Sequence, residues 1–572
     1  MSNGLSGLYI GSSGLQSAQN ALNTTANNLA NVNSKGYVRQ QVVFTDNRYT
    51  KFKTATSRVN LQQSGLGVSI GDVVHARDVF LDKAYRAENG RRGFYEACYE
   101  VTSYVEDMFQ ELSGEQFKES INDLWVAFQE LSKAPADSVN QNLVIQKAEL
   151  LVSRTQTLYG DLQDYQANIN QQIVGSVDRI NEIGDRIFKL SLEVQKVEAG
   201  GVETAMTVRD ERDLLLDELA EYTKFEMIED PTGFMIITID GVEFVTESQC
   251  NHMTVYTQED TGFSTPCWEN LSDMEDGGPY VDVYRLDGII SSEANTDIGS
   301  LKALLILRGS GYGTYQDMAS LEAYEKVEDC LVMETQAQLD HLLHTIVTTM
   351  NDLFCPNLET TLTKNLTDAN GNVLKAGSTI KILDTENCTL GEDGELPPRE
   401  LFERMGMERY TEYTDEDGTV YYVYNEEDFT NGDSLYSVNN LQVNEELKKY
   451  GTLLPAYTKN GTVDMKMGER IATAWETDCM TINPKDEQPC TFQGYYDRMI
   501  SNLGIVGNTY KTASETMSNT VMSIDNSRLQ QMGVSSDEEL TKMIKYQAAY
   551  NAASRYITVM SQLTELVVTG LA

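Results

Sequence analysis

The stretch that decides the fold lies at the C-terminal end and begins Ser536-Asp537-Glu538-Glu539-Leu540. It continues to Thr569 without a proline or glycine, which predicts one uninterrupted helix about 50 Å long. Ser536 and Glu539 have the spacing of a capping box, and the acidic first turn suits the positive end of a helix dipole. Few compact domains contain a helix of this length, so we expect it to pair with another helix.

Apolar residues recur along this stretch at alternating steps of three and four, which is the spacing of a heptad seam. The seam consists of Met543, Tyr546, Tyr550, Ala553, Ile557, Met560, Thr564 and Val567. A second, softer seam near the N-terminus contains Leu8, Leu15, Leu22 and Leu29, with Ala18, Thr25 and Val32 between and after them. Two such seams at opposite ends predict that the chain leaves from and returns to one place. The alternative is two ordinary core helices of a large bundle.

The residues after the leucines read Ala26-Asn27-Asn28-Leu29-Ala30-Asn31-Val32-Asn33-Ser34-Lys35-Gly36-Tyr37. This segment resembles the N-terminal signature of the flagellar rod, hook and junction proteins, which often has Thr-Pro in place of Ser34-Lys35. Gly36 is expected to take the positive φ that stops the helix.

Two further segments narrow the resemblance. Arg77-Asp78-Val79-Phe80-Leu81-Asp82-Lys83-Ala84-Tyr85-Arg86 is similar to the hook-associated protein 1 family, the first junction proteins between hook and filament. The charged segment Arg209–Leu219 also resembles that family. Its mixed charges are typical of a solvated helix face with i,i+4 pairs.

Composition excludes several classes of function. The chain has 572 residues and a net charge of −43, which opposes binding to nucleic acid or to an anionic membrane surface. No basic segment followed by an apolar run marks a cleaved signal peptide, and no apolar run has the length of a membrane span. The eight cysteines allow a disulfide such as Cys250–Cys267 or Cys479–Cys490, or a set of reduced thiols.

The periodicities predict a multidomain α+β fold. It has terminal coiled-coil helices, a long-helix bundle body built from both chain halves, and β-rich middle domains. We expect the inner coiled-coil layer at 1–45 and 534–572, the helical body at 46–225, 298–355 and 488–533, a β-rich domain at 226–297, and a β-rich variable insertion at 356–487. Asp240-Gly241, Asn370-Gly371, Asp417-Gly418, Asn431-Gly432 and Asn460-Gly461 are hairpin-turn candidates. The insertion is expected to fold autonomously.

No catalytic, cofactor or metal site is expected. His341 and His344 stand at i,i+3, but no HExxH motif surrounds them, which favours a packing role over zinc binding. The segment from Asp368 begins like a calcium loop but has Val373 where glycine is needed, so a β-turn is the better interpretation.

The resemblance implies an extracellular structural adaptor of the bacterial flagellum that is not an enzyme. Such proteins form a homo-oligomeric ring between the hook protein on one side and the second junction protein and filament on the other. They are exported by the flagellar type III apparatus without a cleaved signal peptide, and a chaperone binds the C-terminal region. The expected assembly residues are Leu8, Leu15, Leu22, Leu29, Asn28, Asn31, Gly36, Met543, Tyr546, Tyr550, Ile557, Met560 and Val567.

Two alternatives stay open. The chain could be a hook or rod-type axial protein, which shares residues 26–37 but not residues 77–86. It could instead be an adhesin-like surface protein that binds glycans through the insertion, where Tyr410, Tyr413, Tyr421, Tyr422 and Tyr424 cluster.

Overall fold

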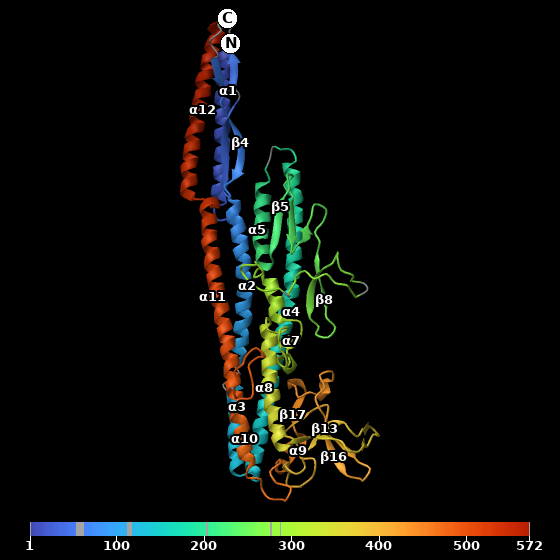
Figure 1. The fold of residues 1–572 in the computed structure, drawn as a ribbon. Coiled ribbons are helices and arrows are strands. Elements are labelled where there is room, and N and C mark those ends of the chain that lie inside the picture. Colours follow the sequence, from blue (N-terminus) through green and yellow to red (C-terminus); the bar gives the residue numbers. More distant parts are fainter. Residues whose placement is uncertain are drawn as a thin grey trace.

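The computed structural model describes residues 2–47, 49–52, 62–110, 117–201, 204–274, 277–286 and 288–570. It shows an elongated α+β molecule in which both termini lie at one end (Figure 1). Long helices run along the molecule, and the β-rich units project from the helical body on one side. The chain therefore passes outward through the body and returns, as the two terminal seams predict.

The terminal layer contains helix α1 (Ser2–Ala30) and helix α12 (Ser536–Gly570), which lie side by side. A β-ribbon accompanies them, in which β1 (Gln40–Asp46) pairs antiparallel with β4 (Val68–His75). β2 (Tyr49–Phe52) and β3 (Gln62–Gly65) form a second antiparallel pair.

The body is built around α4 (Ser138–Glu198), a helix of 61 residues. Asp137 caps it, with its side chain accepting from the backbone N–H of Val139. Its buried residues recur at steps of three and four, so one face is covered along its whole length. The helices of the body are α2 (Val79–Gln110), α3 (Phe117–Lys133), α5 (Met206–Tyr222), α6 (Ser300–Arg308), α7 (Leu321–Tyr324), α8 (Leu331–Phe354) and α11 (Phe492–Met532). Helix α11 lies along α2, which joins the two halves of the chain.

The first β-rich unit follows α5. β5 (Phe225–Glu229), β6 (Met235–Ile239) and β7 (Val242–Val245) form an antiparallel meander. Asp240 and Gly241 both have positive φ, which confirms the predicted hairpin turn. β8 (Met253–Thr257) and β9 (Ser264–Trp268) form a separate antiparallel pair that packs on α4.

The insertion contains a six-stranded sheet in the order β10-β13-β16-β15-β11-β12. The strands are β10 (Asn357–Thr361), β11 (Leu366–Asp368), β12 (Val373–Leu374), β13 (Thr379–Leu383), β15 (Tyr410–Thr414) and β16 (Val420–Tyr424). β14 (Phe402–Arg404) pairs with β17 (Leu441–Val443). Asn370-Gly371 and Asp417-Gly418 join paired strands, as predicted, and Gly461 has the positive φ of a turn. The prediction for Asn431-Gly432 is wrong, because Asn431 caps a 3-10 turn (Gly432–Ser434).

The insertion is not separated from the body. Most of its buried apolar residues belong to the same hydrophobic cluster as those of α3, α4 and α8, and only Leu362, Leu366 and Val423 form a small cluster of their own among the described residues. The region also contains helices α9 (Glu445–Lys449) and α10 (Met467–Glu476), and Trp475 of α10 stacks on Trp125 of α3 at 5.5 Å. The buried carboxylate of Asp340 in α8 accepts from the backbone N–H of Val438. This packing argues against an autonomous unit.

Candidate assembly interface

The contact line of α1 is a stripe of small residues. Its members recur at steps of three and four and are Gly7, Gly11, Gly14, Ala18, Ala21, Thr25 and Asn28, of which all but the half-buried Gly14 are buried. A Cβ atom placed on Gly7 would lie 2.3 Å from Met560 Cε, and one on Gly11 would lie 2.6 Å from Ile557 Cγ1. The glycines therefore let the two helices approach closely.

The leucines predicted to form this seam lie one residue further along α1. Leu8, Leu15, Leu22 and Leu29 are all half-buried at the edge of the stripe. The predicted members Ala18 and Thr25 do lie on the stripe, so only the leucines of the predicted seam are displaced, by one residue. The prediction placed the leucines in the seam because they are the most hydrophobic residues of the helix. In the structure the small residues lie there, because they allow the two helices to approach most closely.

The seam of α12 lies where its spacing predicts, apart from its last member. Met543, Tyr546, Tyr550, Ala553, Ile557, Met560 and Thr564 are half-buried, whereas Val567 is 51% exposed. A second set of apolar residues on α12 is exposed and consists of Leu540, Ile544, Tyr556, Val559, Leu563, Leu566, Val567 and Val568. Helix α12 therefore presents apolar side chains both toward α1 and away from it.

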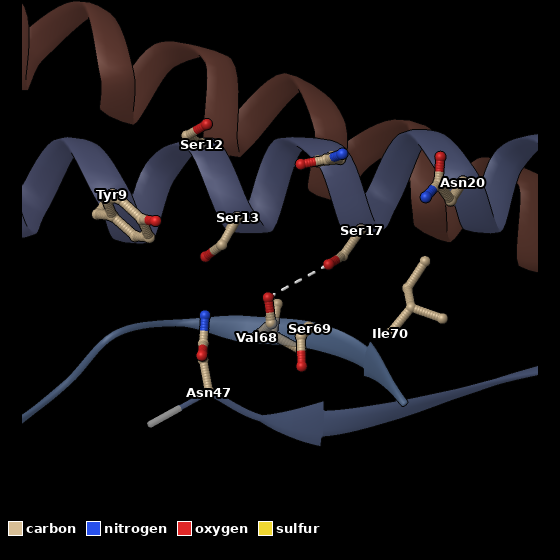
Figure 2. Close-up of a pocket in the computed structure, with 10 residues that line it drawn as sticks. Tyr9, Ser12, Ser13, Ser17, Asn20, Asn47, Val68, Ser69 and Ile70 are labelled. Carbon is tan, nitrogen blue, oxygen red and sulfur yellow. Dashed lines mark hydrogen bonds between the residues drawn. The ribbon is translucent and has the colours of Figure 1, made fainter. Parts of the chain in front are cut away.

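The ribbon β1–β4 lies along α1 and encloses a groove of about 500 Å³ (Figure 2). The groove is mostly polar, with Ser13 and Ser17 on α1 pointing toward the ribbon and the Asn47 side chain pointing toward α1. Ser17 donates from its hydroxyl to the backbone oxygen of Val68 at 3.4 Å. The ribbon thus covers a polar side of α1.

The side chain of Asn28 connects four parts of the terminal layer. Its amide nitrogen donates to the backbone oxygen of Gln40 at 2.9 Å and to Glu539 Oε2 at 3.0 Å. Its oxygen accepts from the Tyr37 hydroxyl at 2.8 Å and from the Gln40 N–H at 3.0 Å. One buried amide therefore joins the end of α1, the turn at Tyr37, the start of β1 and the start of α12.

Glu539 does not form the predicted capping box. The α12 cap is provided by Ser535, whose backbone oxygen accepts from the Glu539 N–H and whose hydroxyl accepts weakly from Glu538. The Glu539 side chain is 1% exposed, and Lys542 Nζ lies 2.6 Å from its Oε1. Burial, with the charges of Asp210 and Glu539 adding, raises the pKa of the neighbouring Tyr37 to about 12.

Asn31 and Gly36 shape the turn after α1. The Asn31 amide donates to the backbone oxygen of Asn27 at 3.0 Å, and its oxygen accepts from the Ser34 hydroxyl at 3.1 Å. Gly36 has a φ of +79°, as predicted, but α1 already ends at Ala30. Gly36 therefore closes the later turn into Tyr37 and does not stop the helix.

A buried ionic cluster lies where the terminal layer meets the body. Its ion pairs join Arg77 to Asp82 and Asp213, Arg86 to Asp213 (3.1 Å) and Asp217 (2.7 Å), and Arg528 to Asp82 (3.0 Å) and Asp217 (2.7 Å). These side chains come from the residues just before α2 and its first turns, from α5 and from the end of α11. The cluster holds the outgoing and returning parts of the chain together.

The prediction that Arg209–Leu219 is a solvated helix face is wrong. Asp210 is 7% exposed and Arg212 is 1% exposed, and Arg212 donates to the Gly233 backbone oxygen and pairs with Glu229. The sequence did contain a signal for this burial. Both this segment and residues 77–86 carry charges at four-residue spacing, so their charges could have been expected to pair with each other.

His75 and Asp210 lie beside this cluster, with 3.5 Å between Nε2 and Oδ1. Burial, with the charge of Arg77 adding, lowers the pKa of His75 to about 4. Burial also raises the pKa of Asp210 to about 7. The neutral forms of both side chains are therefore favoured at this site.

The other polar residues singled out from the sequence have separate partners. His341 meets the edge of Tyr495, whereas His344 stacks on Tyr315 and lies 3.0 Å from Glu427 Oε2. Asp368 accepts from the backbone N–H groups at 370 and 372, which makes the expected turn. All eight cysteines are free thiols, so neither suggested disulfide is formed.

Comparisons with known proteins agree with this arrangement. Residues 102–358 match the family model of the flagellar hook-associated protein FlgK helical domain. Residues 8–37 match the flagella basal body rod protein, and residues 526–568 match the flagellar basal body rod FlgEFG protein C-terminal region.

Flagellar hook-associated protein 1 of Bacillus subtilis is 23% identical over 570 residues, covering 99% of this chain and 98% of that protein. The Escherichia coli protein of the same name is 27% identical over 246 residues, 42% of this chain and 43% of its own length. The solved structure of the flagellar hook junction protein FlgK from Burkholderia pseudomallei superposes with a TM-score of 0.50 at 10% identity, covering 78% of this chain and 99% of that one.

The paired terminal helices and the long-helix body define a flagellar axial protein. Within that class, the helical-domain match and the full-length relative indicate the flagellar hook-associated protein 1 family, and the solved structure shares the fold. This is a structural family of the flagellum. Among the described residues, no helix has an apolar stretch long enough to cross a membrane.

Proposed function

We propose that this chain joins hook to filament by assembling into a ring through its terminal helices. The hook protein would contact one side of the ring, and the second junction protein and the filament the other. The observation that carries the proposal is the exposed apolar set on α12, whose members are 42–72% exposed. Exposed apolar side chains arranged along one long helix are typical of a protein-binding surface.

In one subunit, too few other elements pack against the terminal helices to bury their apolar side chains. Within the described part of α12, only Glu539 is buried, and every seam residue remains partly accessible. The half-buried leucines of α1 lie at the edge of the same layer. A second subunit packed against α12 would bury Val559, Leu563 and Leu566, and each fully buried side chain of this size contributes about 1.5–3 kcal/mol.

The proposed domain roles follow the expected boundaries, except for β4. Residues 1–45 and 534–572 form the inner layer together with β4, which pairs with β1 and so lies outside the helical body expected from residue 46. The helices between 79 and 225 and those at 298–355 and 488–533 form its support, and 226–297 and 356–487 face outward. The export chaperone would bind the C-terminal region, where the same apolar residues are accessible before assembly. Export would use the flagellar type III apparatus without a cleaved signal peptide.

The proposal is tested by Val559→Asp with Leu563→Asp in the full chain. Because both side chains are more than half exposed, we expect the monomer's melting temperature to stay unchanged and incorporation at the hook tip to be lost. Val139→Asp on α4, at a residue 70% exposed, is the matched control and should assemble normally. Electron microscopy of hook–filament particles gives the readout, and normal junctions with the double variant would contradict the proposal.

Neither alternative function is favoured. The matches to the hook-associated helical domain cover residues 102–358, beyond the termini that rod proteins share. The five insertion tyrosines all pack against hydrophobic clusters, and the Tyr410 hydroxyl donates to the buried Cys355 backbone oxygen at 3.0 Å. They do not form a free aromatic platform for glycans.

A further inference from the structure

Three potential metal ligands meet where the first β-rich unit packs on α4. They are Asp185 of α4 and Cys250 and His252 from the segment that leads into β8. One ligand atom from each lies within 4.8 Å of the others, and His252 Nε2 is 3.0 Å from Asp185 Oδ1. The assembly interface uses none of these residues.

The segment 250–252 directs two of these ligands to the same side. Cys250 forms an isolated antiparallel bridge with Val245, so the backbone here is extended. Side chains alternate along an extended backbone. Asn251, the residue between them, donates from its amide to the Glu243 backbone oxygen, and the alternation places Cys250 and His252 together on the opposite side.

Helix α4 provides a close and well-held opposing surface. A Cβ atom on Gly184 would lie 2.8 Å from Cys250 Sγ, so glycine permits the thiol to approach this helix. Asn181 holds the strand in place, because its oxygen accepts from the Met253 N–H at 2.9 Å and its amide donates to the Met253 oxygen at 2.8 Å. The three ligands therefore sit on two elements that are already clamped together.

We propose that Asp185, Cys250 and His252 bind one Zn²⁺ ion. Zinc takes thiolate, imidazole and carboxylate ligands at about 2.0–2.3 Å, which brings ligand atoms to within roughly 4 Å of one another. Calcium and magnesium prefer oxygen ligands alone, so this mixed set favours zinc. The side chains of His252 and Asp185 are 41% and 45% exposed, which leaves room for water as the fourth ligand.

The ion would act as a cross-link between α4 and the edge of β8. The alternative is a simple ion pair between His252 and Asp185. The thiol of Cys250 has no role in that ion pair but is a ligand in the zinc site, so substitution of Cys250 distinguishes the two interpretations. The sequence signal is weak, because only Cys250 and His252 are close in the chain and Asp185 lies on a distant helix.

The test uses the purified full chain, stripped of metal with a chelator and titrated with Co²⁺ as a spectroscopic substitute for Zn²⁺. We expect one equivalent to bind, with a thiolate-to-cobalt charge-transfer band that added Zn²⁺ removes. Cys250→Ser should abolish the band, whereas Cys479→Ser, at an exposed thiol, should keep it. Asp185→Asn and His252→Asn should weaken Co²⁺ binding by more than about tenfold, the loss typical of disturbing even outer partners of a metal site.

Zn²⁺ should also raise the melting temperature of the unmodified chain and of Cys479→Ser, but not that of Asp185→Asn. The Asp185→Asn variant keeps the thiol and the imidazole, so it tests the site even if Cys250→Ser folds poorly. Absence of a charge-transfer band in the unmodified chain, or a band that survives in folded Cys250→Ser, would overturn the proposal.

Discussion

Helices α4 and α12 share the same spacing of apolar residues but differ in how deeply those residues are buried. Helix α4 buries side chains from Val144 to Val194, whereas only Glu539 is buried in the described part of α12. The reason is the number of neighbours, since α4 contacts α3, α5, α6, α8 and several strands, and α12 contacts mainly α1. Periodicity therefore predicts where a seam lies, but the surrounding layers decide how much stability it provides.

The buried ionic cluster should show the largest effect of a single substitution. Arg528→Met leaves the carboxylates of Asp82 and Asp217 with one cation fewer, and Arg528 is only 4% exposed. We expect a loss of about 3–5 kcal/mol in the free energy of unfolding, measured by urea denaturation. Arg179→Met, at a side chain 41% exposed, is the control and should change it by about 1 kcal/mol or less. Equal effects would mean that the cluster does not hold the junction together.

A matched pair of leucines compares the two helices directly. Leu162→Ala in α4 removes a fully buried side chain and should lower the free energy of unfolding by about 2–5 kcal/mol. Leu563→Ala in α12, at a residue 53% exposed, should change it by about 0.5 kcal/mol or less. Thermal and urea unfolding of the monomer provide the measurement. A large loss for Leu563→Ala would show that α12 is already packed in the free subunit.

The His75–Asp210 pair should give two opposite pH dependences that cancel in the unmodified chain. The folded pKa of Asp210, about 7, lies above its unfolded value near 4, so its contribution is present at low pH and is lost as pH rises through 7. The folded pKa of His75, about 4, lies below its unfolded value of about 6.5, so its contribution is lost as pH falls below 6.5.

Single variants should separate these contributions. From pH 7 to pH 5, His75→Gln should gain about 2 kcal/mol of unfolding free energy relative to the unmodified chain, because only Asp210 still responds. Asp210→Asn should lose about 2 kcal/mol over the same range. Urea denaturation at both pH values tests this, with the double variant as control. Parallel pH profiles for both single variants would contradict the assignment.

The smallest expected effect distinguishes two glycines of α1. Gly14→Ala places a Cβ at an ordinary 3.8 Å from Ala553 and should stabilise the helix by up to about 1 kcal/mol. Gly11→Ala places a Cβ 2.6 Å from Ile557 Cγ1, which forces α1 and α12 apart. We therefore expect no net stabilisation from this substitution. Hydrogen exchange across α1 and α12 measures the difference. Equal protection in both variants would show that α1 and α12 are not in close contact in the free subunit.

The sequence by itself determined the helix periods, the two terminal seams, the Asp-Gly hairpin and the family resemblance, because these depend on local spacing and backbone preference. Only the tertiary structure decided which face of α1 is buried. It placed the small residues, not Leu8 or Leu15, against α12. Hydrophobicity ranks leucine first, but the distance between helix axes is set by the smallest side chains between them.

The tertiary structure also decided which charges are buried and which polar residues meet. Asp217 and Arg528 are 311 residues apart, and Asn28 and Glu539 are 511 residues apart, yet each pair is hydrogen-bonded. Asp185 likewise meets Cys250 and His252 only because β8 packs on α4. Such contacts result from packing between elements that are far apart in the chain, so they cannot be predicted from the local sequence around either residue.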